Sequence, residues 1–233
     1  MPPTDGPVRI ALIHALNESI QPAQAAFAAY WPQAYCFDLL DTSLAVDRAH
    51  RGCLDQPIRQ RVHDLADYAL ASGGHHGQTQ GILYTCSAFG PAIDAVKRSL
   101  PIPVLRPNEA AFEIALGYGP RIGLVVTFEP SAKALESELL EMAAERGRAV
   151  EVKTVIAEAA LPALKRGDGE RHDHLAAQAA ASLVGVDAIV LGQFSLARAK
   201  AAVASVCAAP VLTTPQSAVE ALRKRLRPDT SMI

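Results

Sequence analysis

The sequence predicts an α/β protein built from two similar halves, each a four-stranded parallel sheet flanked by helices. Short, continuously apolar runs alternate with segments of helical periodicity, which is typical of parallel strands covered on both faces. The pattern of the first half then recurs in the second. Segments 121–131, 188–195 and 210–220 repeat the patterns of 9–19, 81–88 and 103–113, respectively.

The repeat sets the expected domain boundaries. We expect an N-terminal tail at 1–8, a first half at 9–118 and a second half at 119–233. Segment 41–56 carries mixed charges and is expected to be a loop. In the first half, apolar runs predict strands at 9–13, 35–40, 81–84 and 104–105, and helical patterns follow at 21–30, 57–71, 90–99 and 108–117. In the second half, strands are expected to begin near 121, 150, 188 and 211, with a helix at 172–184.

Composition narrows the class of function. The 233 residues are half apolar and carry a formal net charge of −2, without a basic patch for nucleic acid. No apolar stretch is long enough to span a bilayer, and the N-terminus lacks the features of a signal peptide, so a cytoplasmic protein without membrane partners is expected. The four cysteines are far apart in the sequence and are expected to be reduced thiols. The His75-His76 pair has no thiol or carboxylate partner nearby, so no metal is expected.

Cys86 is the first candidate for chemistry. The strand at 81–84 ends in Thr85, Cys86 and Ser87, and Gly90-Pro91 then opens a helix. Ligands bind beyond the carboxyl ends of parallel strands, and a helix start there favours an ionised thiol. The alternative is a small buried hydrophobic residue, which is a common use of free cysteine.

Other polar residues follow predicted strand ends. Asn17 comes after the first strand, where helix capping is the alternative function, and His14 precedes it. Thr127, Ser131 and Gln193 occupy corresponding positions in the second half. Two halves that face each other would direct these strand ends into one cleft between them, the usual kind of site for a small ligand.

The duplicated halves, the Thr85-Cys86-Ser87 corner and the glycine-anchored corner before Gln193 resemble the aspartate/glutamate/hydantoin racemase superfamily, over residues 9–226. The resemblance implies flavodoxin-like halves, a small carboxylate substrate, no cofactor and a homo-oligomer. In that family a cysteine from each half acts on one face of the substrate α-carbon. Cys86 takes the first of these positions. The residues at positions comparable to those that hold the substrate are Asn17, Thr85, Ser87, Thr127 and Ser131.

One position departs from the family pattern. Gln193 stands where the second cysteine is expected, and a glutamine can exchange hydrogen bonds but no proton at neutral pH. We expect a cofactor-independent enzyme that transfers a proton at the α-carbon of a small carboxylate, with Cys86 as acid/base and Gln193 as a substrate contact. The alternatives are a one-thiol decarboxylase of malonate-like acids, cis–trans isomerisation by addition of Cys86 to a double bond, and a non-catalytic carboxylate-binding protein. An acidic substrate would need a further cation, for which Arg106 is a candidate, although a surface charge is the commoner use.

Overall fold

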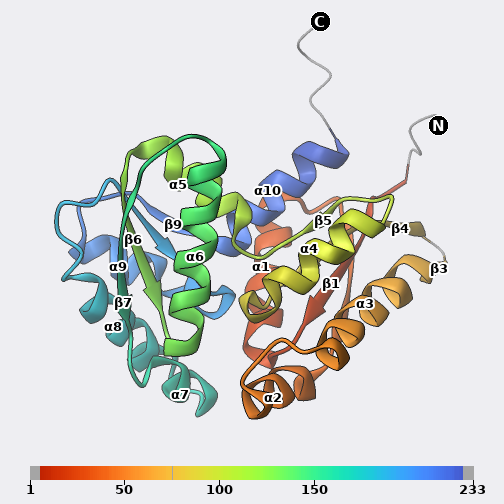
Figure 1. Cartoon of the computed structure of the whole chain (residues 1–233), viewed down its shortest axis with the longest axis horizontal. Helices are drawn as coiled ribbons and strands as arrows, with labels where there is room; N and C mark the ends of the chain where they lie inside the picture. Colours follow the sequence, from red (N-terminus) through yellow and green to blue (C-terminus); the bar gives the residue numbers. More distant parts are fainter. Residues whose placement is uncertain (1–5, 75, 228–233) are drawn as a thin grey trace, which may run out of the picture. The chain divides into compact units, whose positions relative to one another are not determined.

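The computed structural model describes residues 6–74 and 76–227, and divides the chain into two compact units. The first unit comprises Met1–Arg106 and Val219–Ile233, and the second comprises Pro107–Ala218. Each unit is an α/β structure with its own sheet (Figure 1). The predicted fold class of two α/β halves is confirmed, whereas the cleft between them stays a prediction. His75, residues 1–5 of the predicted tail and the C-terminal residues 228–233 lie outside the described residues.

The first sheet has the strand order β2-β1-β4-β5, with all four strands parallel. It contains one strand more than predicted, because β3 (Gly73–Gly74) pairs antiparallel with the start of β4. Gly77 permits this tight hairpin because its φ of +78° suits glycine. The four parallel strands are β1 (Arg9–His14), β2 (Tyr35–Leu40), β4 (Gly77–Tyr84) and β5 (Val104–Leu105).

Helices cover both faces of this sheet. On one face, α3 (Gln56–Ala71) and α4 (Gly90–Ser99) bury an apolar core that also receives Leu44. α1 (Ile20–Tyr30) and the C-terminal part of α10 (Thr214–Leu226) lie on the other face (Figure 1). α10 packs directly on the strands. A Cβ atom at Gly81 would lie 3.0 Å from the Leu226 side chain and 3.2 Å from Leu222, so a larger residue there would have to displace these side chains.

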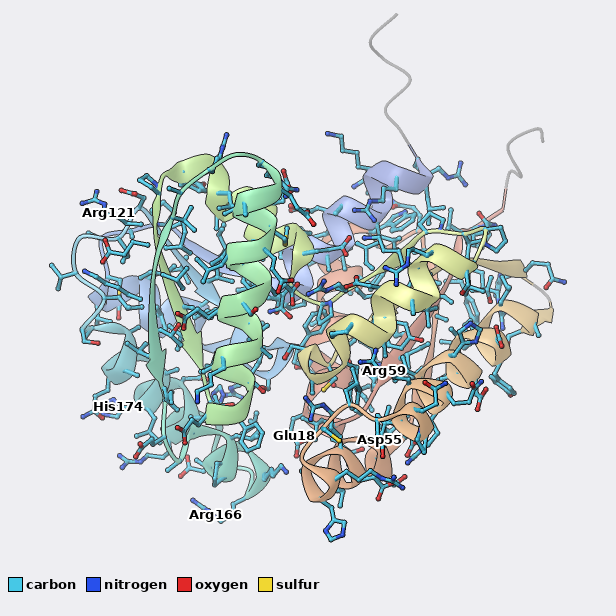
Figure 2. All side chains as sticks on the ribbon, viewed as in Figure 1. Glu18, Asp55, Arg59, Arg121, Arg166 and His174 are labelled. Carbon is cyan, nitrogen blue, oxygen red and sulfur yellow. The ribbon has the colours of Figure 1, made fainter. Side chains whose placement is uncertain are left out.

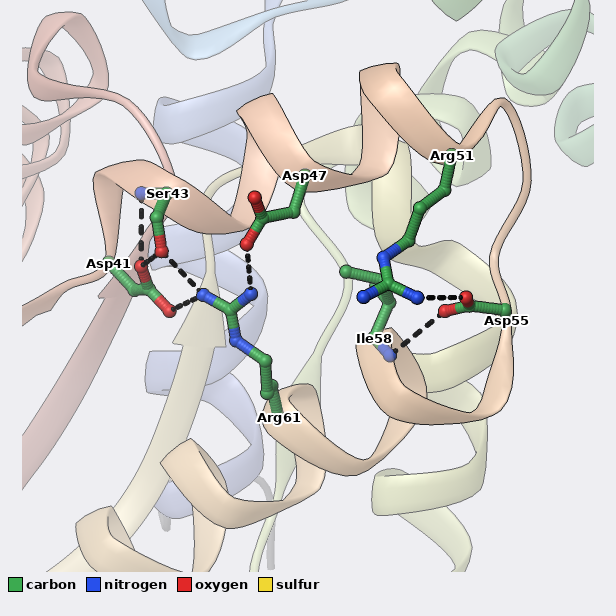
Figure 3. Close-up of polar contacts among 7 residues, drawn as sticks. All are labelled: Asp41, Ser43, Asp47, Arg51, Asp55, Ile58 and Arg61. Atoms are coloured by element: carbon green, nitrogen blue, oxygen red, sulfur yellow. Dashed lines mark hydrogen bonds and ion pairs between the residues drawn. The ribbon is translucent and has the colours of Figure 1, made fainter.

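The predicted loop at 41–56 is wrong, because most of it folds as helix α2 (Thr42–Arg51). The Asp41 side chain caps its N-terminus, and Gly52, in a left-handed conformation, ends it. Within the helix only Leu44 is buried, and the mixed charges along the segment favoured the loop interpretation. Arg61 of α3 fastens the helix by bonding both Asp41 and Asp47, each at 2.5 Å (Figure 3).

The second unit repeats the topology of the first. Its sheet has the order β7-β6-β8-β9, and all its strands are parallel, so each strand corresponds in position to one of the first sheet. This correspondence confirms the internal duplication. The strands are β6 (Arg121–Val126), β7 (Glu151–Ile156), β8 (Ala188–Leu191) and β9 (Val211–Thr213). The helices are α5 (Glu109–Tyr118), α6 (Glu129–Glu145), α7 (Ala160–Lys165), α8 (Gly169–Ala180) and α9 (Lys200–Val206).

The division into units differs from the expected boundary at 118/119. Helix α5 follows the last strand of the first sheet, yet it packs with α6 on one face of the second sheet. Helix α10 begins after β9 and belongs to the first unit from Val219 onward. The last helix of each repeat therefore packs with the opposite sheet. A sequence repeat marks equivalent segments but does not determine which sheet each helix covers.

The histidines at 172 and 174 differ from expectation as well. A helix that begins at 172, as the sequence predicts, would leave His172 and His174 in a solvated first turn, but His172 is fully buried and its Nδ1 lies 2.8 Å from an oxygen of Asp173. His174 is exposed at the edge of the second unit (Figure 2). The helix begins at Gly169, three residues earlier than predicted, and this places His172 on its inner face. No helix in the described part of the chain is long and apolar enough to cross a membrane.

Candidate functional site

Cys86 lies at the strand-to-helix corner that the sequence predicts. β4 ends at Tyr84, Cys86 has extended backbone angles, and a 3₁₀ turn (Ser87–Phe89) leads into α4. The Cys86 side chain is half-buried and packs against the apolar core of the first unit. Pro91 falls in the first turn of α4, where a missing N–H costs nothing. The corner therefore presents Cys86 beyond the carboxyl end of a central strand.

The ionisation of Cys86 differs from expectation. Burial raises the pKa of the Cys86 thiol, and this effect exceeds the opposing influence of the Ala88 N–H and of the positive charge on Arg48. The prediction that the thiol ionises more easily than a free cysteine is therefore wrong in direction. At neutral pH the resting side chain is a protonated thiol, which can give a proton before it can take one.

Arg48 is a residue of this corner that sequence reasoning missed. It extends from α2, and its Nε donates a hydrogen bond to the Ala88 carbonyl at 2.8 Å. Ala88 lies in the turn that directly follows Cys86, so the bond joins α2 to that turn across forty positions of sequence. Because we expected a loop here, no side chain of this segment was assigned to the site.

His14 supports the same corner from β1. The buried imidazole lies 2.9 Å from Thr85 Oγ1 through Nδ1, and 2.9 Å from Asp38 Oδ1 through Nε2. Since a carboxylate only accepts, the neutral ring must carry its proton on Nε2 and accept from Thr85 on Nδ1. Burial lowers the pKa of His14, although Asp38 opposes this. Gln24 donates to the other oxygen of Asp38 at 2.8 Å, which completes a chain of four side chains.

The other candidates in the first unit fall at the same sheet edge. Asn17 is exposed in the short 3₁₀ helix after β1 (Asn17–Ser19), and it does not cap that helix, whose N-cap is Leu16. Ser87 is half-buried beside Cys86. Thr85 is buried, and its hydroxyl also lies 3.1 Å from Ser19 Oγ. The structure thus brings together Asn17, Thr85, Cys86 and Ser87, with the Thr85 hydroxyl already engaged by neighbouring side chains.

Gln193 holds the equivalent corner of the second unit. Its Oε1 accepts hydrogen bonds from both the backbone N–H and the hydroxyl of Thr127, each at 2.7 Å. A backbone N–H can only donate, so the atom facing it must be the amide oxygen. Hence the Gln193 amide nitrogen points away from Thr127 and offers two N–H donors to anything else that approaches.

Buried polar side chains surround this second corner. Asn108 is fully buried at the N-cap position of α5, but its side chain makes no capping bond there; its Nδ2 instead donates to the Gly192 carbonyl at 2.7 Å. Ser131 is buried in the first turn of α6, and Thr214 is buried directly after β9. The second unit therefore gathers Thr127, Ser131 and Gln193 at one sheet edge, and Asn108 fixes the backbone there.

The fold and these corners define a class of protein: duplicated α/β units with polar groups at the carboxyl ends of their central strands. The family model for Asp/Glu/hydantoin racemase matches residues 23–222. The chain belongs to the Asp/Glu/hydantoin racemase family.

Solved structures support the same fold at low sequence identity. Glutamate racemase isoform RacE1 from Bacillus anthracis is 13% identical, with a TM-score of 0.71 over 94% of this chain and 81% of that one. Allantoin racemase from Pseudomonas fluorescens is 17% identical, with a TM-score of 0.70 over 94% and 91%. A putative Asp/Glu racemase from Yersinia pestis is also 17% identical, with a TM-score of 0.66 over 94% and 99%. No curated protein matches the sequence.

Proposed function

We propose that this chain is a cofactor-independent enzyme that transfers a proton at the α-carbon of a small carboxylate, with Cys86 as the acid/base. The observation that carries the proposal is the pair of equivalent corners. One presents a thiol beyond β4, and the other presents an amide whose oxygen is held by two donors from Thr127. Family membership supports an isomerase-like activity of this kind.

The chemistry assigns different functions to the two corners. An α-proton next to a carboxylate is weakly acidic, so the site must stabilise the negative charge that develops when the proton leaves. The Gln193 amide supplies hydrogen-bond donors for that charge but exchanges no proton itself. Cys86 first loses its own proton to solvent, and the thiolate so formed takes the α-proton. The resulting thiol exchanges that proton with solvent and returns a solvent-derived proton to the same face of the carbon. We therefore propose exchange of the α-proton with retention of configuration, in place of racemisation with two thiols.

The protonated state of Cys86 favours a second candidate, decarboxylation of a malonate-like acid. In that reaction the bond from the α-carbon to one carboxylate breaks, CO2 leaves, and the electron pair stays on the α-carbon. The Cys86 thiol then donates its proton to that carbon, and solvent reprotonates the thiolate. A thiol whose pKa is raised by burial begins this cycle in the required form.

The experiment is NMR of candidate acids incubated in D2O with the protein. The panel contains aspartate, glutamate, hydantoins and aryl- or alkyl-malonates. We expect deuterium incorporation or CO2 loss for one class of acid, and its disappearance in Cys86→Ala. Cys207→Ala is the matched control, because Cys207 is also half-buried and burial also raises its pKa. Turnover that survives in Cys86→Ala would refute the proposal. Binding of an acid without any exchange would favour a non-catalytic binding protein.

A further inference from the structure

We propose that Arg48 is the anion-recognition residue of the Cys86 site and binds a carboxylate of the substrate that Cys86 acts on. The substrate part of this inference rests on the proposed function. The location of the cation does not, because it follows from contacts within the first unit.

The first argument is the position of the guanidinium. The bond from Arg48 Nε to the Ala88 carbonyl holds the half-buried side chain against the turn that begins one residue after Cys86. The bond uses Nε, which leaves the two terminal nitrogens with their donors. An arginine head can bind both oxygens of one carboxylate through such a pair of donors. The Arg48 guanidinium is therefore held in a fixed orientation beside the Cys86 corner before any ligand binds.

The second argument is charge. Arg61 takes the carboxylates of Asp41 and Asp47, and Arg51 takes Asp55 at 2.6 Å (Figure 3). These three aspartates at and around α2 thus form their ion pairs with arginines other than Arg48. Within residues 6–74 and 76–227, no acid forms an ion pair with Arg48. A half-buried cation without a counter-ion favours an anionic ligand.

The third argument comes from the thiol. Arg48 is the positive group whose charge acts to lower the pKa of Cys86, against the larger effect of burial. A carboxylate bound at Arg48 would therefore lie at the turn that follows Cys86, within electrostatic range of its thiol. Arg106, the cation considered from sequence, is instead bonded to Asp94 at 2.8 Å.

The substrate class follows from this arrangement. The corner offers the guanidinium of Arg48 and the neutral polar side chains of Asn17 and Ser87. We infer an acid whose carboxylate is attached to the reacting carbon. A neutral ring such as a hydantoin would leave the Arg48 charge without a partner and is not expected to bind well.

The test uses two alkylating reagents that differ in charge. Iodoacetate carries a carboxylate and iodoacetamide does not; with both, a bond forms between the Cys86 sulfur and the methylene carbon, and iodide leaves. Peptide mapping by mass spectrometry gives the rate at Cys86 for each reagent at one pH. We expect the iodoacetate-to-iodoacetamide rate ratio at Cys86 to exceed that of glutathione by about tenfold, because a nearby cation attracts the anionic reagent.

Variants assign this preference to Arg48. Arg48→Gln should lower the ratio to that of glutathione, and Arg48→Lys should keep most of it. Arg59→Gln is the matched control, because Arg59 is also half-buried and also bonds a carbonyl, that of Leu54, through Nε at 3.0 Å. Its ratio should equal that of the wild type. Added guanidinium should partly restore the ratio in Arg48→Ala, which separates loss of charge from a displaced turn.

The outcomes separate this inference from the proposed function. A ratio in Arg48→Gln equal to the wild-type ratio would overturn the inference, even if the D2O experiment shows turnover. A ratio that depends on Arg48, in a protein that turns over none of the acids, would uphold the anion site and refute the enzymatic function. Where turnover is found, we expect Arg48→Gln to raise KM at least tenfold, with a smaller change in kcat.

Discussion

Gln193 gives the sharpest prediction, because two substitutions of similar size should have opposite consequences. In Gln193→Leu both hydrogen bonds from Thr127 are lost. The Thr127 hydroxyl can rotate toward another acceptor, but its backbone N–H cannot, and the residue is only 8% exposed. An unsatisfied buried donor costs about 1–3 kcal/mol, so Gln193→Leu should lower the free energy of unfolding by about 2 kcal/mol.

Gln193→Glu should behave differently. A glutamate keeps an oxygen facing both donors of Thr127, and bonds to a charged acceptor are at least as strong. We therefore expect the free energy of unfolding to stay within about 1 kcal/mol of the wild type. The same change removes both N–H donors and adds a negative charge, so KM for a carboxylate should rise at least tenfold.

The assay is urea unfolding followed by circular dichroism, with equal m-values required before the midpoints are compared. Gln178→Leu is the control, because Gln178 is exposed on α8 and its replacement should cost less than about 0.5 kcal/mol. A Gln193→Leu protein as stable as the wild type would refute the locked amide. Equal destabilisation by Leu and Glu would refute the assignment of Oε1 to the Thr127 donors.

Three further predictions follow from the first unit. Burial lowers the pKa of His14 below 6.5, so the unfolded chain takes up this proton at a higher pH than the folded protein does. The stability that is present above pH 6.5 should therefore fall as the pH drops from 6.5 to the folded-state pKa. Urea midpoints at pH 7.5 and 5.5 should differ less in His14→Gln than in the wild type, and an unchanged difference would contradict this. Cys36, whose pKa burial and the Asp38 charge raise to about 12, should react with iodoacetamide at pH 8 more slowly than the exposed Cys53, and the reverse order in peptide mapping would contradict the structure. Leu222→Ala should lower the free energy of unfolding by about 2–4 kcal/mol, since this side chain of α10 is fully buried; a loss below about 1 kcal/mol in urea unfolding would contradict the packing of α10.

The sequence was most informative where the signal is local and repeated. Apolar runs placed the parallel strands of both sheets, and the likeness between 9–19 and 121–131 predicted two similar units, whose sheets have corresponding strand orders. The corner at Cys86 was predictable because strand, small polar residues and an early helical proline follow one another directly.

Features that depend on tertiary packing could not be predicted. The exchange of α5 and α10 leaves no mark on the repeat, so the boundary at 118/119 differs from the observed division. The direction of the Cys86 pKa depends on how deeply the core encloses the thiol, and a sequence pattern does not give that depth. Arg48 was missed because its helix buries only one residue, Leu44. The His14–Asp38 contact joins neighbouring strands, and only the register of β1 against β2 reveals it.

The central claim is that Cys86 transfers a proton on one face only, and one measurement tests it most directly. A single enantiomer of the acid found active in the panel is incubated in D2O, and α-deuterium incorporation and appearance of the opposite enantiomer are followed together. The account predicts incorporation much faster than inversion, and loss of both in Cys86→Ala. It also predicts that inversion increases in Gln193→Cys, which restores a second thiol. Equal rates of incorporation and inversion in the wild type would contradict the account, because they require a second acid that Gln193 cannot be.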